Sequence, residues 1–246
     1  MSFDAGQWTL LAIGAAIAGF SKTGIPGTSI LFVALFANVL PAKEATGVVL
    51  PLLIFADLFS AVVYRKHLAW RRVGGLLPWA VGGVVLGWLA LRWIDNAAAA
   101  RVIGAIIAAM LGLHLWRQRT QSEEALQRVP VALGPAAGVL AGFTTTVANA
   151  AGPVMVLYLL AMRLPKLEFL GTSAAFFLAI NWIKVPFMVQ LGLINPASLA
   201  LNLWLLPAVA AGALIGRRVA QTVNQRAFET VALGLTAVAA AKLLFF

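Results

Sequence analysis

Two polar stretches interrupt the apolar sequence of this 246-residue chain. The first, GFSKTGIPGTS at residues 19–29, combines a lysine with three glycines, a proline and four hydroxyl side chains. The second, GFTTTVANAAGP at residues 142–153, has three consecutive threonines and an asparagine. A lysine at bilayer depth costs about 2.5–3.5 kcal/mol on insertion scales, which makes Lys22 a candidate for function. The alternative is that Lys22 extends its ammonium to the membrane surface.

Two more charged residues fall within long apolar segments. Asp57 lies in LPLLIFADLFSAVV, and Lys184 lies in LAINWIKVPFMV. An intramembrane acid is typical of a proton relay, and an intramembrane base is typical of an anion contact or an ion pair. Asn181 precedes Lys184 by three residues, so both lie on one helix face. The sequence allows Asp57 to pair with Lys22 or with Lys184, and a purely structural ion pair is the alternative to a coupling role.

The sequence offers little that an enzyme would need. A catalytic site requires a nucleophile or base clustered with its helpers. The chain has no cysteine and only two histidines, His67 in a basic loop and His114 near the end of an apolar segment. Neither belongs to a metal-binding spacing, and the sequence has no nucleotide-binding loop. We therefore expect no enzyme activity, no catalytic residue, no metal and no cofactor.

The composition is typical of an integral membrane protein. Hydrophobic residues make up 62% of the chain and charged residues only 11%, whereas soluble domains carry about 25% charged residues. Apolar runs recur at close to the ~20 residues that a membrane-crossing helix requires. We expect ten helical segments, at residues 8–20, 28–40, 45–64, 73–91, 97–116, 131–143, 154–161, 169–190, 197–215 and 227–246.

The two halves of the chain resemble each other, which indicates an internal duplication. GFSKT at residue 19 recurs as GFTTT 123 residues later, and PAKEATG at residue 41 recurs as PKLEFLG 124 residues later. At this second offset Asp57 falls on Asn181. We expect an N-terminal repeat at residues 1–116, a cytoplasmic linker at 117–129 and a C-terminal repeat at 130–246. Glu44 and Glu168 follow equivalent prolines and are expected in the first turn of their helices.

Loop charges predict how the two repeats are oriented. Residues 65–72, RKHLAWRR, carry four Lys or Arg residues, whereas the equivalent loop at 191–198, LGLINPAS, carries none. By the positive-inside rule the first loop is cytoplasmic and the second is outside. Five segments per repeat then invert the second copy, as in many transporters. We expect a multi-pass protein of the cytoplasmic membrane with both termini outside.

The first two segments of each repeat are short, which predicts a broken helical hairpin followed by three transmembrane helices. Residues 21–27 and 144–153 would form the non-helical connections, which membranes tolerate only inside protein or beside a wet cavity. Pro26 and Pro153 favour a new helix start nearby. Because helix N-termini attract anions, two inverted hairpins would build an anion site near the midplane. The candidate substrate-binding residues are Ser21, Lys22, Thr23, Gly24, Thr144, Thr145, Thr146, Asn149, Asn181 and Lys184, with Asp57 as the coupling candidate. Each hydroxyl can instead serve helix packing.

The duplicated pattern GFSKTGIPG, PAKEATG and the later aspartate, with the basic loop near HLAWRRV, resembles the TauE/SafE family of sulfite and sulfonate exporters. The likeness covers nearly the whole chain, and its most specific part is the glycine–lysine–glycine–proline stretch with the downstream P-x-x-E-A-x-G. The resemblance implies movement of small sulfur-containing anions such as sulfite, sulfoacetate and related organosulfonates. The second motif of this chain is less glycine-rich than that of many relatives.

The leading hypothesis is a secondary transporter that exports a small sulfur-containing anion, with proton coupling through Asp57 as a further hypothesis. A membrane-embedded lipid-phosphate hydrolase and an anion channel are the alternatives. The expected partners are the small anion and the lipid bilayer. The net charge of +10 arises largely in short loops, which fits membrane orientation better than nucleic-acid binding. A homodimer remains open beside a monomer.

Overall fold

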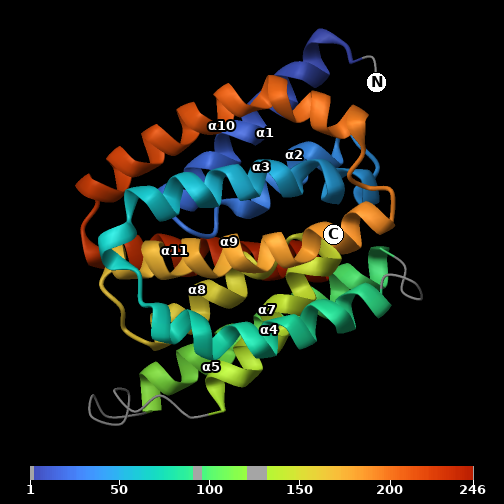
Figure 1. Ribbon diagram of the computed structural model, residues 1–246. Coiled ribbons are helices and arrows are strands. Elements are labelled where there is room, and N and C mark those ends of the chain that lie inside the picture. Colours follow the sequence, from blue (N-terminus) through green and yellow to red (C-terminus); the bar gives the residue numbers. More distant parts are fainter. Residues whose placement is uncertain (1–2, 91–95, 121–131, 246) are drawn as a thin grey trace.

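The computed structural model describes residues 3–90, 96–120 and 132–245, and these residues form a bundle of helices without strands (Figure 1). This confirms the all-α class expected from the sequence. The elements are α1 (Ala5–Thr23), α2 (Ser29–Ala37), α3 (Ala42–Val63), η1 (Arg65–His67), α4 (Trp70–Ala90), α5 (Asn96–Thr120), α7 (Leu133–Ala148), α8 (Ala151–Ala161), α9 (Lys166–Gln190), α10 (Pro196–Thr222) and α11 (Gln225–Phe245).

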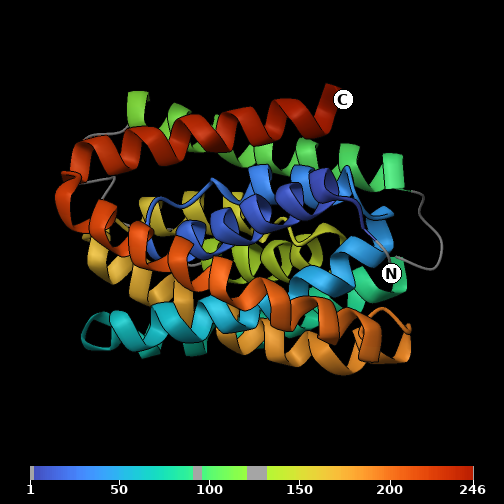
Figure 2. The same cartoon turned by 90° about the horizontal axis from the view of Figure 1, so that it is seen from above.

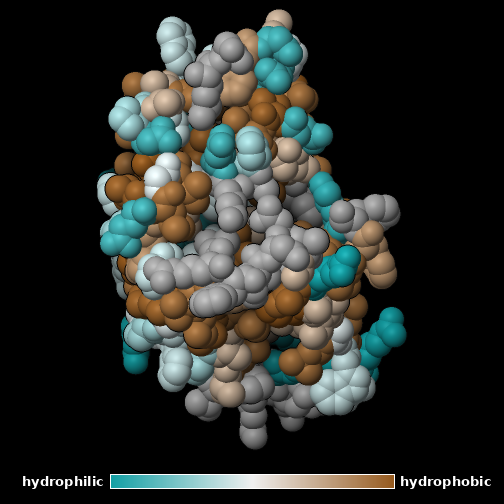
Figure 3. All heavy atoms as spheres, turned by 90° about the vertical axis from the view of Figure 1, so that its right-hand side faces the viewer, coloured by the Kyte–Doolittle hydropathy of each residue, from teal (hydrophilic) through white to brown (hydrophobic). Residues whose placement is uncertain are grey.

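The bundle has the dimensions and the surface of a polytopic membrane protein. Within the described residues, α3, α4, α9, α10 and α11 are long and apolar enough to cross a bilayer. Large apolar side chains cover the outside, as on α10, where Leu203 and Trp204 are 69% and 77% exposed. Figure 3 looks along the bundle and shows hydrophobic residues interspersed with hydrophilic ones at this end. An isolated soluble domain does not expose so much apolar surface.

Two helix pairs are packed unusually closely because glycines lie at their contacts. A Cβ atom on Gly212 of α10 would lie 1.8 Å from the carbonyl oxygen of Ala16 in α1. On Gly142 of α7 it would lie 2.0 Å from the carbonyl oxygen of Ala80 in α4. The fourth helix of each half therefore packs on the first helix of the other half, and α5 lies beside α11 (Figures 1 and 2). This reciprocal exchange supports our proposal of two related repeats.

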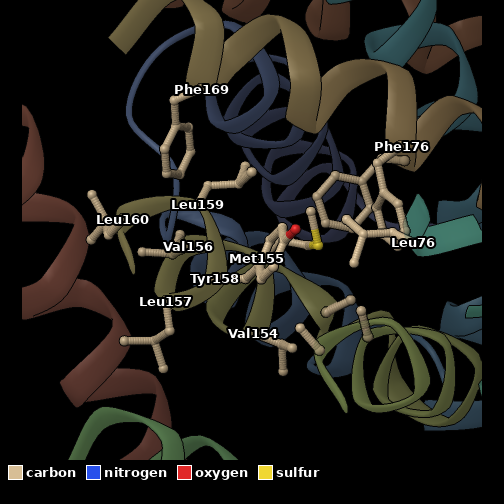
Figure 4. Close-up of a cluster of buried hydrophobic side chains, with 14 of the residues drawn as sticks. Leu76, Val154, Met155, Val156, Leu157, Tyr158, Leu159, Leu160, Phe169 and Phe176 are labelled. Carbon is tan, nitrogen blue, oxygen red and sulfur yellow. The ribbon is translucent and has the colours of Figure 1, made fainter. Parts of the chain in front are cut away.

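The short helix α8 lies at the centre of one hydrophobic core. Its side chains project on all sides into neighbouring helices (Figure 4), and Val154 and Leu159 are fully buried. A helix that is hydrophobic all round is stable only when it is surrounded in this way. The corresponding helix α2 is less enclosed, because Phe32 and Phe36 are buried while Leu31 is 48% exposed.

The breaks between the short helices are shorter than the sequence predicts. Ser21, Lys22 and Thr23 belong to the last turn of α1, and the three threonines of the second stretch belong to α7. The irregular connections are confined to residues 24–28 and 149–150. The prediction was wrong here because Ser and Thr in a membrane helix bond to their own backbone carbonyls and do not need to break it. The prediction for the two glutamates is confirmed, because Glu44 lies in the first turn of α3 and Glu168 in the first turn of α9.

Basic side chains gather at one end of the bundle. The η1, α8–α9 and α10–α11 connections and the end of α5 lie together at the left of Figure 1, whereas α1 begins and α11 ends at the right. The residues near the left end are Arg65, Lys66, Arg71, Arg72, Arg117, Arg119, Arg163, Lys166, Arg217, Arg218 and Arg226. α5 continues through the first four residues of the predicted linker to Thr120; linker residues 121–129 and the predicted repeat boundary at 130 lie outside the described residues.

Candidate functional site

The first hairpin turns between α1 and α2 inside the protein. Gly24 ends α1 by donating its N–H to the carbonyl oxygen of Phe20 at 2.7 Å. Gly27 has a φ of 93°, which suits glycine, and a Cβ there would lie 2.9 Å from the Cβ of Leu235 on α11. The Tyr64 hydroxyl donates to the carbonyl oxygen of Thr23 at 2.5 Å. Protein groups therefore bond to the N–H of Gly24 and the carbonyl oxygen of Thr23 at this break, as the hydrocarbon region requires for irregular backbone.

The second hairpin turns more tightly, at Asn149 and Ala150. Asn149 adopts a left-handed conformation with φ of 51°, which asparagine tolerates better than most residues. Its N–H donates to the carbonyl oxygen of Thr145, and the N–H of Ala150 donates to that of Thr144. The bond from Asn149 is the one that defines an αL cap of a helix C-terminus, and the bond from Ala150 satisfies a second carbonyl of α7. α8 starts immediately at Ala151, with Pro153 in its first turn.

The tips of the two hairpins meet in space. A Cβ atom on Gly152 at the start of α8 would lie 2.8 Å from the Ser29 hydroxyl at the start of α2. Both helix N-termini border one small cavity of about 30 Å³, which has room for about two water molecules. Its wall includes Ser21, Lys22, Pro26, Gly27, Ser29, Phe32, Leu53, Thr145, Asn149, Gly152, Val156, Leu170, Ser173, Ala174, Phe177 and Asn181. Two helix dipoles thus direct partial positive charge towards the same space.

Lys22 and Asp57 form an ion pair at this cavity. The Lys22 ammonium lies 2.8 Å from Oδ1 of Asp57, and the two side chains are 12% and 0% exposed. The ammonium also lies 3.8 Å from the ring centroid of Phe177, a cation–π contact. Asn181 donates its Nδ2 to Oδ2 of Asp57 at 2.8 Å. Of the two partners that the sequence allowed for Asp57, the folded chain uses Lys22.

Lys184 is fully buried beside the cavity and bonds to neutral oxygens of the second hairpin. Its ammonium donates to the carbonyl oxygen of Thr145 at 2.8 Å, to the Thr145 hydroxyl at 3.1 Å and to Oδ1 of Asn149 at 2.7 Å. Its three hydrogens have partners, but none of these partners carries a negative charge. The site therefore contains two lysines and one carboxylate.

The predicted site residues divide into two groups. Five of them line the cavity: Ser21, Lys22, Thr145, Asn149 and Asn181. Lys184 lies beside the cavity and donates hydrogen bonds to Thr145 and Asn149. The remaining four predicted residues are not among those lining it: Thr23, Gly24, Thr144 and Thr146.

Helix packing explains where those four residues lie. The hydroxyls of Thr144 and Thr146 donate to carbonyls of their own helix, α7. The Thr23 hydroxyl donates to the carbonyl oxygen of Ala213 on α10 at 2.7 Å. A Cβ on Gly24 would lie 2.8 Å from the Cα of Gly216 on the same helix. These residues hold the hairpins in place, which is the packing alternative weighed above.

Sequence reasoning missed several residues of the site. Ser60 donates its hydroxyl to the carbonyl oxygen of Lys22 at 2.7 Å, and Phe177 covers the Lys22 ammonium. Ser29 and Ser173 also line the cavity. The repeat offset contains a signal for Ser60. Ser60 lies 124 residues before Lys184, and it follows Asp57 by three residues, just as Lys184 follows Asn181. No comparable signal exists for Phe177, one of fourteen phenylalanines.

The sequence matches one known protein family. The model of the family described as Sulfite exporter TauE/SafE matches residues 11–243, which is nearly the whole chain. No curated protein and no solved structure matches the chain at a significant level. Within the described residues, no group of three or more His, Asp or Glu side chains could hold a metal ion. The protein belongs to the TauE/SafE family of sulfite exporters.

Proposed function

We propose that the protein is a secondary transporter that exports a small sulfur-containing anion, either sulfite or an organosulfonate such as sulfoacetate. The family is one of transporters, and the long apolar helices make this chain a multi-pass membrane protein. The observation that carries the proposal is the charge of the hairpin site. Two lysine side chains lie beside one carboxylate among the described residues, next to two helix N-termini.

A protonated Lys184 without a carboxylate partner would cost several kcal/mol inside a protein, even after relaxation. A bound anion would offset this cost, both by direct attraction to the ammonium groups and through the helix N-termini. The small volume of the cavity favours a compact anion over a bulky one. The hydroxyls of Ser21, Ser29 and Ser173 supply hydrogen-bond donors at the cavity wall.

The ion pair between Lys22 and Asp57 suggests how proton binding is linked to anion binding. In this structure the Asp57 carboxylate is paired with the Lys22 ammonium, which is the group that a transported anion would bind. A proton on Asp57 removes this competing charge and leaves the ammonium to the anion. Anion and proton would then bind together, so that a pH gradient influences transport. Asn181 retains a hydrogen bond to the protonated acid.

Flux measurements in proteoliposomes test the proposed function. We expect saturable counterflow of labelled sulfite, which a channel would not show, with weaker responses to sulfate and phosphate than to sulfite. Lys22→Ala should reduce flux at least tenfold, because it removes the ammonium at the cavity. Lys66→Ala is the matched control, since this exposed lysine in η1 lies away from the site and should leave flux unchanged. Normal counterflow by Lys22→Ala would reject the assignment of the site.

A further inference from the structure

A second and larger cavity lies at the basic end of the bundle. It is bounded by the ends of α5 and α8 and by α11, three helices that contact one another. Its volume is about 310 Å³, compared with about 30 Å³ for the hairpin cavity. The two cavities share no lining residue, so the second one is not an extension of the transport site. Its size is in the range of pockets that bind small molecules.

The charges in this cavity favour an anion with one negative charge. Arg117 of α5 and Arg163 after α8 line it together with one acid, Glu229 of α11. Oε1 of Glu229 accepts a hydrogen bond from Nε2 of Gln225 at 2.6 Å. Among the lining residues that the structure describes, two guanidinium groups and one carboxylate sum to a single positive charge, which suits a phosphodiester better than a doubly charged phosphomonoester. Guanidinium groups bind phosphate oxygens in a bidentate manner.

A histidine in the wall provides an unused polar group. Nε2 of His114 is buried and has no hydrogen-bond partner within the described part of the chain. His114 also lines the cavity, next to Arg117 on the following turn of α5. Leaving a buried polar atom without a partner destabilises the protein, so a ligand that bonds to it binds more tightly.

The surroundings indicate that the phosphodiester belongs to a lipid. Trp116, next to Arg117 in sequence, is 57% exposed, and tryptophan gathers at the headgroup level of membranes. Leu160 and Leu233 form an apolar part of the same cavity wall, which a soluble headgroup would not need. Basic pockets between helices at the cytoplasmic side are suited to anionic lipid headgroups.

We propose that the cavity between α5, α8 and α11 binds the phosphodiester headgroup of an anionic phospholipid, with Arg117 and Arg163 as phosphate ligands and His114 as an additional hydrogen-bonding group. This site is separate from the transported anion and does not depend on the proposed transport activity. Lipid bound here would join the two outer helices α5 and α11 to α8 at the membrane surface.

Native mass spectrometry of the purified full chain in detergent tests this site. We expect phosphatidylglycerol to bind at least tenfold more tightly than phosphatidylcholine with the same acyl chains. Arg117→Gln combined with Arg163→Gln should weaken phosphatidylglycerol binding at least tenfold. The matched control combines Arg65→Gln with Arg71→Gln, because these two exposed arginines lie at the same end but on η1 and α4. An equal loss in both double variants, or no loss in either, would overturn the site.

Two further measurements separate the alternatives. Soluble glycerophosphoglycerol carries the headgroup without acyl chains; binding as tight as that of the lipid would overturn the lipid assignment. Gln118→Trp narrows the cavity from an exposed position without removing a charge, and it keeps the test decisive if the arginine variant does not fold. We expect this variant to lose at least tenfold in phosphatidylglycerol affinity, and unchanged affinity would overturn the proposal.

Discussion

At the scale of single residues, an equivalent hydrogen bond holds each hairpin, but the lysine accepts the bond in one half and donates it in the other. Ser60 donates to the carbonyl oxygen of Lys22, and Lys184 donates to the carbonyl oxygen of Thr145. The two donor residues are 124 positions apart in the sequence, and the two acceptor residues are 123 positions apart. Each hairpin therefore has one lysine at this contact, but in the first half it lies on the hairpin and in the second half on the long helix α9. This exchange places two ammonium groups around a single acid.

Substitution of Asp57 tests whether this residue couples proton binding to transport or only forms a structural ion pair. Asp57→Asn keeps the shape of the side chain but cannot lose or gain a proton, so we expect transport to lose its dependence on a pH gradient. The measurement is sulfite flux into proteoliposomes with equal and unequal internal and external pH. Asp4→Asn is the control, because this exposed N-cap of α1 keeps its capping ability as asparagine. A pH-gradient dependence that persists in Asp57→Asn would refute proton coupling through this residue.

At the scale of the elements, glycines decide which helices approach closely. Gly83 and Gly82 are neighbours in α4, yet their surroundings are opposite. A Cβ on Gly83 would lie 2.1 Å from the carbonyl oxygen of Val139 in α7, whereas one on Gly82 would meet nothing within 4 Å. The sequence shows both glycines, but it does not show which of them faces a neighbouring helix. The packing of α4 on α7 makes that distinction.

This difference predicts a large effect on stability for one glycine and a small effect for the other. Gly83→Ala forces α4 away from α7, and overpacking of this kind costs about 1–3 kcal/mol or more. We expect the unfolding temperature in detergent to fall by about 2–12 °C, using about 2–4 °C per kcal/mol for a chain of this size.

Gly82→Ala serves as the control because it adds a methyl group in open space and improves helix propensity by up to about 1 kcal/mol. Its unfolding temperature should stay the same or rise slightly when both variants are measured by circular dichroism in one detergent. A fall of similar size in the two variants would contradict the close contact between α4 and α7.

At the scale of the whole molecule, the basic residues are concentrated at one end of the helix bundle. Eleven of the eighteen Lys and Arg residues lie near one described end of the bundle, and Lys22 and Lys184 lie at the hairpin site. The positive-inside rule assigns the basic end to the cytoplasm. Both termini would then face the outside, because α1 begins and α11 ends at the opposite end (Figure 1).

The natural absence of cysteine allows a direct test of this orientation. Asn38→Cys and Ala197→Cys place single thiols at exposed positions of the end where α1 begins, and Lys66→Cys and Arg218→Cys place them at the basic end. We expect a membrane-impermeant maleimide to label the first two in intact cells and the last two only after permeabilisation. Labelling in the reverse order would show that the protein has the opposite orientation.

The sequence by itself determined the membrane class, the helical fold and the family, and it predicted five of the residues that line the hairpin cavity. Hydropathy over ~20 residues and the internal offset are properties of the chain, so they need no knowledge of packing. Contacts between distant segments are different, because they depend on which helix faces meet. Only the tertiary structure paired Asp57 with Lys22, placed Lys184 against Asn149, and assigned Thr23, Thr144 and Thr146 to helix packing. A hydroxyl bonds equally well to its own helix, to a neighbour or to a ligand, and the fold alone decides which partner is within reach.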